Sequence, residues 1–194
     1  MKLNEIIDKA YSLYMPQLKN EITSLANFVY EQNPEIIVEI GTKFGGTFMI
    51  WNEISNGLKI SIDLPNGIHG GVSLENTTKR NDLFKELYGD KCIFIEGDSH
   101  HQSTYNHLIE ILKDRQIDFM FIDGDHTYDG VKQDFEMYSK LVKKGGYIAF
   151  HDINDTQKHR DREVYVCKLW NELKGEKIEF NDYADWGGIG VIKI

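Results

Sequence analysis

Short apolar runs alternate along most of the chain with segments of helical periodicity. The runs are short and continuous, which is typical of buried parallel strands. They lie at residues 36–40, 58–62, 92–95, 117–122 and 147–150. Between the last two runs, Val131, Phe135, Tyr138 and Val142 recur at helical spacing. Two lysines and Gly145 and Gly146 follow, so we predict that a helix closes there and links two parallel strands.

The same pattern predicts the organisation of the whole chain. Further helices are expected around Thr47, over residues 79–88, and through Leu108 and Trp170. Two late strands, 177–180 and 188–194, are close enough in sequence to pair antiparallel. Residues 1–33 read as two helices separated at Pro16. We therefore predict an α/β domain over residues 34–194, with a doubly wound, mostly parallel sheet and a helical extension over residues 1–33.

Two strands of this predicted sheet run directly into acids and histidines. Asp123, Asp125 and His126 follow the run at 117–122, and His151 and Asp152 follow the run at 147–150. In open parallel sheets, ligands bind in the crevice outside the carboxyl ends of the strands. We therefore expect both groups to face one crevice and to form the centre of a functional site.

The loop after the first strand carries a carboxylate and several glycines. It reads Glu39, Ile40, Gly41, Thr42, Lys43, Phe44, Gly45, Gly46, and it lacks the glycine spacing of a dinucleotide site. A carboxylate at the strand end repels phosphate and attracts a cation. Gly41 and Gly45 allow the backbone to approach a ligand closely.

The next two strands also end in polar side chains. Asp63 lies roughly twenty residues after the glycine loop, where a carboxylate can accept hydrogen bonds from a ribose diol. Asp98 and Ser99 follow the third strand, beside the same pocket. The alternative is that Glu39 and Asp63 are helix-capping or solvated acids.

Four of these strand ends resemble the motif series of class I S-adenosylmethionine-dependent methyltransferases. The segments are VEIGTKFGGT, ISIDLP, IEGDS and FIDGDH, and the resemblance covers about residues 35–194. It implies a Rossmann-like sheet of seven strands with an antiparallel last strand. It also implies which residues contact S-adenosylmethionine. The methionine moiety would be bordered by Glu39, Gly41, Thr42 and Gly45, and the ribose hydroxyls would be held by Asp63. Asp98 and Ser99 would lie near the adenine, with Asp123 also beside the cofactor.

Within that superfamily, FIDGDHTYDGVKQDF followed by GGYIAFHD is similar to the metal-dependent O-methyltransferases. The similarity is greatest to the group that includes cephalosporin hydroxylase-like and sugar O-methyltransferases. It implies a divalent cation, Mg²⁺ or Mn²⁺, held by Asp123, His151 and Asp152. It also implies a general base at Asp125, and His126 is the other candidate if the base must titrate near neutral pH.

His151 departs from the pattern because those relatives offer oxygen at its position. Three interpretations stay open. His151 is a ligand of a softer cation, or it points away while Asp152 coordinates, or it is the base. A purely structural alternative is that Asp125 or Thr127 caps the following helix and Asp152 caps a turn. The other histidines, at positions 69, 100, 101, 107 and 159, are expected in loops or at the surface.

Composition limits the classes of partner. The 194 residues carry a formal net charge of −9, which argues against nucleic-acid binding, and the two cysteines show no CxxC spacing. No signal peptide and no membrane-length apolar run is evident. We therefore expect a cytoplasmic O-methyltransferase. Its acceptor would be a small hydroxylated molecule such as a sugar or secondary metabolite, and a homodimer is one possible oligomeric state.

Two rival functions remain at this point. A non-haem iron oxygenase would use His126, His151 and one carboxylate from Asp123 or Asp152. The acid-bearing glycine loop counts against it, because such an enzyme needs no nucleoside pocket. The second rival is a cofactor-binding partner subunit without transfer activity, and the retained acids argue against that.

Overall fold

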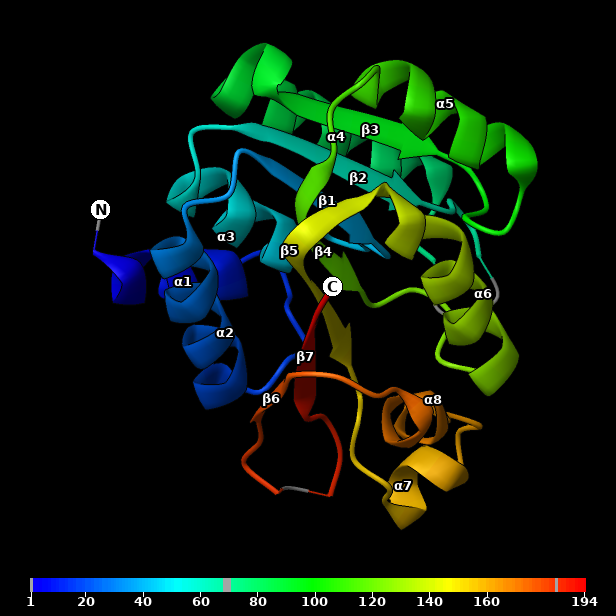
Figure 1. Ribbon diagram of the computed structural model, residues 1–194. Helices are drawn as coiled ribbons and strands as arrows, with labels where there is room; N and C mark the ends of the chain where they lie inside the picture. The colour runs from blue at the N-terminus through cyan, green and yellow to red at the C-terminus, as the bar shows by residue number, and fades with distance from the viewer. Residues whose placement is uncertain (1, 68–70, 184) are drawn as a thin grey trace.

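The computed structural model describes residues 2–67, 71–183 and 185–194 (Figure 1). Its strands form one seven-stranded sheet in the order β3-β2-β1-β4-β5-β7-β6, in which only β7 runs antiparallel to its neighbours. The strands are β1 Ile36–Ile40, β2 Leu58–Asp63, β3 Cys92–Glu96, β4 Ile117–Ile122, β5 Val142–His151, β6 Lys177–Phe180 and β7 Ile189–Lys193. The helices are α1 Leu3–Tyr11, α2 Lys19–Gln32, α3 Gly46–Ile54, α4 Leu74–Tyr88, α5 Gln102–Leu112, α6 Tyr128–Tyr138, α7 Gln157–Arg160 and α8 Val166–Glu172. The predicted doubly wound sheet with an antiparallel last strand is confirmed.

Helices cover both faces of the sheet. Helices α1 to α4 pack on one face, and α5, α6 and α8 pack on the other (Figure 1). Each strand of the centre alternates its side chains between these two apolar clusters, so Ile37 faces one and Val38 faces the other. This explains why the central strands are apolar along their whole length rather than alternating.

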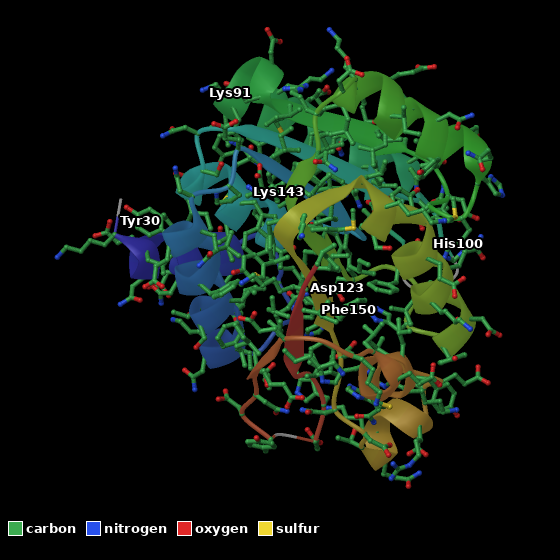
Figure 2. All side chains as sticks on the ribbon, in the orientation of Figure 1. Tyr30, Lys91, His100, Asp123, Lys143 and Phe150 are labelled. Carbon is green, nitrogen blue, oxygen red and sulfur yellow. The ribbon has the colours of Figure 1, made fainter. Side chains whose placement is uncertain are left out.

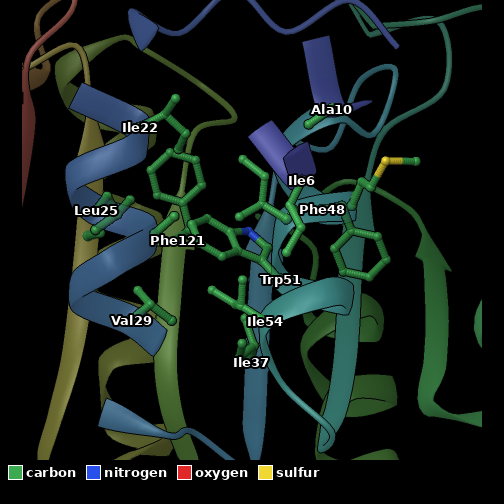
Figure 3. Close-up of a cluster of buried hydrophobic side chains, with 14 of the residues drawn as sticks. Ile6, Ala10, Ile22, Leu25, Val29, Ile37, Phe48, Trp51, Ile54 and Phe121 are labelled. Atoms are coloured by element: carbon green, nitrogen blue, oxygen red, sulfur yellow. The ribbon is translucent and has the colours of Figure 1, made fainter. Parts of the chain in front are cut away.

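The two helices predicted within residues 1–33 pack into the apolar core on one face of the sheet. They are α1 and α2, and the connector at residues 12–18 contains Pro16. Figure 3 shows their apolar side chains gathered around Trp51 of α3. The Trp51 ring in turn lies edge-on to Phe119 and Phe121 of β4, with ring centroids 5.4 and 5.8 Å apart. The first helices therefore cover the middle of the sheet, on the same face as α3.

The boundary between α6 and β5 differs from the sequence-based prediction. The helix ends at Tyr138, a 3₁₀ turn covers Ser139–Leu141, and Val142 already pairs with Ile117 in the sheet. The two glycines therefore lie inside β5 rather than closing a helix. They fit there because the pairing of β4 with β5 shifts register after Ile117, and Gly145 takes a φ of +82°.

Backbone hydrogen bonds hold the loops at the strand ends against one another. The amide of Gly41 donates to the Ile62 carbonyl at 2.9 Å, and the amide of Asp123 donates to the Ile40 carbonyl at 2.8 Å. Gly41 has a φ of +87°, and a Cβ there would lie 2.2 Å from the Asp123 carbonyl oxygen. Only glycine allows this approach, which brings the ends of β1, β2 and β4 to one place.

Candidate functional site

A cleft of about 880 Å³ opens at the carboxyl ends of the central strands. Its walls come from the loops after β1 to β5, from residues 14–17 of the connector between α1 and α2, from residues 158–159 and 162–164, and from Trp186. The predicted site residues on its lining are Gly41, Thr42, Asp63, Asp98, Ser99, Asp123, Asp125, His126, His151 and Asp152. Glu39 and Gly45 were also predicted, but they are absent from this lining. Figure 2 shows Asp123 near the middle of the molecule.

Glu39 and Gly45 lie behind the cleft wall. Glu39 is fully buried, and one of its carboxylate oxygens accepts a hydrogen bond from the Trp51 indole. Burial raises the pKa of Glu39 to about 8. Gly45 has a φ of +91° and packs against the Phe84 ring. Their positions indicate that they support the glycine loop from inside rather than from the surface of the cleft.

Asp63 is held in a buried ion pair that the sequence reasoning did not find. Its Oδ2 lies 2.6 Å from an Arg80 guanidinium nitrogen, and both side chains are less than 10 % exposed. Its Oδ1 accepts from the amide of Thr42 at 3.2 Å, and the same guanidinium nitrogen donates to the Lys43 carbonyl. Asp63 is therefore neither a solvated acid nor a helix cap. It is a fixed carboxylate that joins α4 to the glycine loop.

The loop after β3 forms the third wall of the cleft. Asp98 Oδ1 accepts from the amide of His100 at 2.9 Å. The His100 Nε2 lies 3.4 Å from an oxygen of Asp134, whose side chain is fully buried. The interaction with Asp134 raises the pKa of His100 to about 9, against the opposing effect of burial. His100 was expected in a loop or at the surface, close enough to the third strand end to touch a substrate, and it lines the cleft near Asp98 and Ser99.

The acids at the ends of β4 and β5 form a cluster with histidine. Asp123, His126 and Asp152 each offer one ligand atom, and these atoms all lie within 4.8 Å of one another. Asp152 has a φ of +64°, so the chain leaves the extended conformation directly after β5. The Oδ1 of Asp152 is buried, and imidazole nitrogens of His151 and His159 lie 3.4 and 3.3 Å from it. One imidazole and two carboxylates at this spacing could hold a divalent cation.

His151 faces the same acids. Its Nδ1 lies 3.1 Å from Asp123 Oδ1 and 3.4 Å from Asp152 Oδ1. The interpretation that it points away from the site is therefore wrong, because strand alternation stops at the left-handed backbone of Asp152. Burial alone would lower the pKa of His151, but the two carboxylates raise it well above its usual value. His151 therefore lies within reach of the same cation as Asp123 and Asp152, and its role as ligand or base stays a prediction.

His159 belongs to the cluster as well, contrary to the expectation of a surface position. Its side chain is buried, and its Nε2 lies 3.3 Å from Asp152 Oδ1. His126 approaches the other oxygen of the same carboxylate, with its Nδ1 3.4 Å from Asp152 Oδ2. Burial alone would raise the pKa of Asp152, but the neighbouring His151 holds it well below its usual range. Of the remaining histidines, His69 lies outside the described residues.

Thr127 has the local role that the structural alternative assigned to Asp125 or Thr127. Asp125 Oδ1 accepts from the amide of Thr127 at 2.8 Å, and Thr127 Oγ1 accepts from the amide of Gly130 at 3.1 Å. Thr127 thereby caps α6. Asp125 is not the cap, and it also lines the cleft, so its hydrogen bond with the Thr127 amide does not remove it from the site. No described helix has both the length and the apolarity to cross a membrane.

Comparisons with known proteins agree with this geometry. Among curated proteins, an uncharacterized protein of Acanthamoeba polyphaga mimivirus is 37% identical over 136 residues, 69% of this chain and 58% of that protein. An uncharacterized protein of Sinorhizobium fredii is 22% identical over 174 residues, 84% of this chain and 18% of that protein. The chain thus matches less than two thirds of the length of either relative.

Solved structures show the same fold. An O-methyltransferase from Bacillus cereus in complex with SAH has a TM-score of 0.69 at 18% identity, covering 99% of this chain and 90% of that one. The O-methyltransferase TomG from Streptomyces achromogenes, in complex with SAM, has a TM-score of 0.65 at 14% identity, covering 96% and 88%. A family model described as "Methyltransferase domain" matches residues 38–153, which is more than half of the chain. The resemblance to class I methyltransferases is confirmed, and the chain belongs to the methyltransferase domain family.

Proposed function

We propose that the protein transfers the methyl group of S-adenosylmethionine to a hydroxyl of a small acceptor, with the assistance of a divalent cation. One observation carries the proposal. A single cleft contains the glycine loop, the fixed carboxylate of Asp63, and the cluster of Asp123, His126 and Asp152. A methyl donor and a cation-binding centre would therefore share one space.

The cofactor half of the cleft suits a cationic nucleoside. S-adenosylmethionine carries a sulfonium, which supplies an electrophilic methyl group, and it carries no phosphate. Asp63 has a fixed position because Arg80 and the Thr42 amide hold its carboxylate, so it can accept from ribose hydroxyls without reorganising. Asp98 lies on the same lining. The acids that line this half agree with a cationic ligand.

The cation half offers Asp123, His126 and Asp152 as ligands. A donor set of two carboxylates and one imidazole suits Mn²⁺ and also accommodates Mg²⁺. A bound divalent cation would lower the pKa of an acceptor hydroxyl. The chain belongs to a methyltransferase family, and this favours methyl transfer over a non-haem iron oxygenase.

The residues around the cluster divide the remaining tasks. With His126 at the cation, Asp125 takes the role of proton acceptor, since it lines the same cleft. His151 contacts the carboxylates of Asp123 and Asp152 and so helps to hold both in place. Residues 14–17 and 158–159 line the same cleft and would border the acceptor. Transfer then depends mainly on holding the acceptor oxygen in line with the methyl group.

Calorimetric titration of the chelator-treated full chain tests the proposal. We expect micromolar binding of S-adenosylmethionine, and separate binding of Mn²⁺ or Mg²⁺. The variant Asp152→Asn should lose cation binding and keep cofactor binding, whereas Asp155→Asn, an exposed neighbour, should keep both. Absence of S-adenosylmethionine binding under every metal condition would refute the proposed function. Loss of cofactor binding in Asp152→Asn would mean that Asp152 is structural.

A further inference from the structure

The connector between α1 and α2 forms part of the cleft wall. Residues 14–17 all line the cleft, although they precede the region that matches the family. Tyr11 donates its hydroxyl to the Gln17 carbonyl at 2.6 Å, which fixes the backbone at that point. Met15 packs closely on α3: a Cβ added at Gly46, the first residue of that helix, would lie only 2.7 Å from the Met15 Cβ. The connector is therefore held against the site from both sides.

The Gln17 side chain reaches the acids of the site. It is 4 % exposed, and its Nε2 donates a short hydrogen bond to Asp123 Oδ2. The nitrogen must face the carboxylate, because an ionised carboxylate only accepts hydrogen bonds. The other Asp123 oxygen, Oδ1, faces the Nδ1 of His151 at 3.1 Å. Each oxygen of Asp123 thus has a different partner, and Gln17 fixes the rotation of the carboxylate.

The amide oxygen of Gln17 is left over. It is buried, and it has no hydrogen-bond partner among the described residues. Burying an amide oxygen without a partner costs free energy, so such an atom needs an explanation. The anchoring of the connector does not supply one, since it uses the backbone carbonyl of Gln17 and not its side-chain oxygen. The unpartnered oxygen belongs to the same carboxamide that touches Asp123.

We propose that Gln17 is a positioning residue of the cation site, whose nitrogen orients Asp123 and whose buried oxygen adds a neutral oxygen donor beside the acids. Carboxamide oxygens are among the ligands that Mn²⁺ and Mg²⁺ accept. This inference rests on the cation half of the proposed function. It assigns a role in the site to the N-terminal segment, which otherwise packs only as a cover of the sheet.

Two substitutions at Gln17 give opposite expectations. Gln17→Met keeps the volume and removes both polar atoms, so the affinity for Mn²⁺ should fall by about 10-fold or more, as is typical when a supporting partner of a metal ligand is lost. Gln17→Glu places a second carboxylate against Asp123. Without a cation this like-charge contact should lower the melting temperature, and with Mn²⁺ the added oxygen charge should tighten binding. Gln17→Met carries the test, because a residue with only a packing role would keep the same Mn²⁺ affinity after an exchange that keeps its volume.

The measurement is calorimetric titration of the full chain with Mn²⁺, together with melting temperatures in chelator and titration with S-adenosylmethionine. Gln32→Met and Gln32→Glu serve as controls, because Gln32 is exposed at the end of α2. We expect unchanged S-adenosylmethionine affinity in every variant and changed Mn²⁺ affinity only at Gln17. Equal Mn²⁺ affinity in Gln17→Met and the unmodified chain would overturn the role of Gln17. Absence of Mn²⁺ binding in the unmodified chain would instead refute the cation half of the proposed function, and this inference with it.

Discussion

The buried pair of Asp63 and Arg80 gives the sharpest test of how the cofactor half is built. The two side chains are 2.6 Å apart and are 8 % and 6 % exposed. We consider two single variants, Asp63→Asn and Arg80→Met, and the double variant that carries both. Each single variant leaves one buried charge without its partner, whereas the double variant removes both charges and keeps similar volumes.

The expected magnitude follows from burial. Breaking a buried ion pair by removing one partner costs about 3 to 5 kcal/mol, because the remaining charge is left uncompensated. For a chain of this length that corresponds to a fall of about 6 to 20 °C in melting temperature. Arg80→Met should lie at the lower end, since the amides of Thr42 and Lys43 still donate to Asp63. The double variant should cost at least about 2 kcal/mol less than the sum of the single variants.

Urea unfolding followed by circular dichroism measures these free energies. The exposed pair of Glu75 and Lys79, which lies on the same helix as Arg80, provides the control. Lys79→Met should cost less than about 1 kcal/mol, because exposed ion pairs contribute little. Additive effects of Asp63→Asn and Arg80→Met, within about 0.5 kcal/mol, would refute the reasoning. They would mean that the two charges do not depend on each other in the folded chain.

Two further predictions concern the loop after β1. Glu39 has a folded-state pKa of about 8, so the folded chain holds its proton more tightly than the unfolded chain, and stability should fall between about pH 4.5 and 8 by at most about 1.4 kcal/mol per pH unit. Glu39→Gln should flatten that slope in urea unfolding at pH 5.5 and 7.5, and an unchanged slope would contradict the assignment. Gly41→Ala should cost more than about 3 kcal/mol, because its Cβ would meet backbone at 2.2 Å. Gly145→Ala, which has a positive φ but open space around it, should cost only about 1 to 2 kcal/mol, and equal costs would refute the argument from close approach.

The sheet could be predicted from the sequence because its signals are local. The five continuous apolar runs became β1 to β5, and the late pair became β6 and β7. The acids after these runs met at one cleft because parallel strands end at the same edge. The misplaced boundary between α6 and β5 arose because Lys143, Lys144 and two glycines resemble a helix terminus. In the folded chain a register shift after Ile117 lets them extend the strand.

The partners of the site residues could not be predicted, because they come from distant parts of the chain. Gln17 contacts Asp123 across 106 positions, and no local pattern links them. The sequence around Arg80 contains a weak indication that this arginine is buried. It lies on the buried face of α4 with Thr77, Asn81 and Phe84, so three polar residues share one core-facing stripe. The predicted helix began only at residue 79, and the stripe was not evident.

The position of the family match suggests how the cleft divides its tasks. The matched region, residues 38–153, contains the glycine loop, Asp63, Asp98 and the cluster of Asp123, His126 and Asp152. The rest of the described lining comes from residues 14–17, 158–159, 162–164 and Trp186, on both flanks of that region. A methyl donor places the same demands on every member of such a family, whereas an acceptor does not. We therefore expect that the flanking residues outside the cluster, among them residues 162–164, determine the acceptor. Exchanging residues 162–164 between relatives should change the acceptor and leave S-adenosylmethionine affinity unchanged.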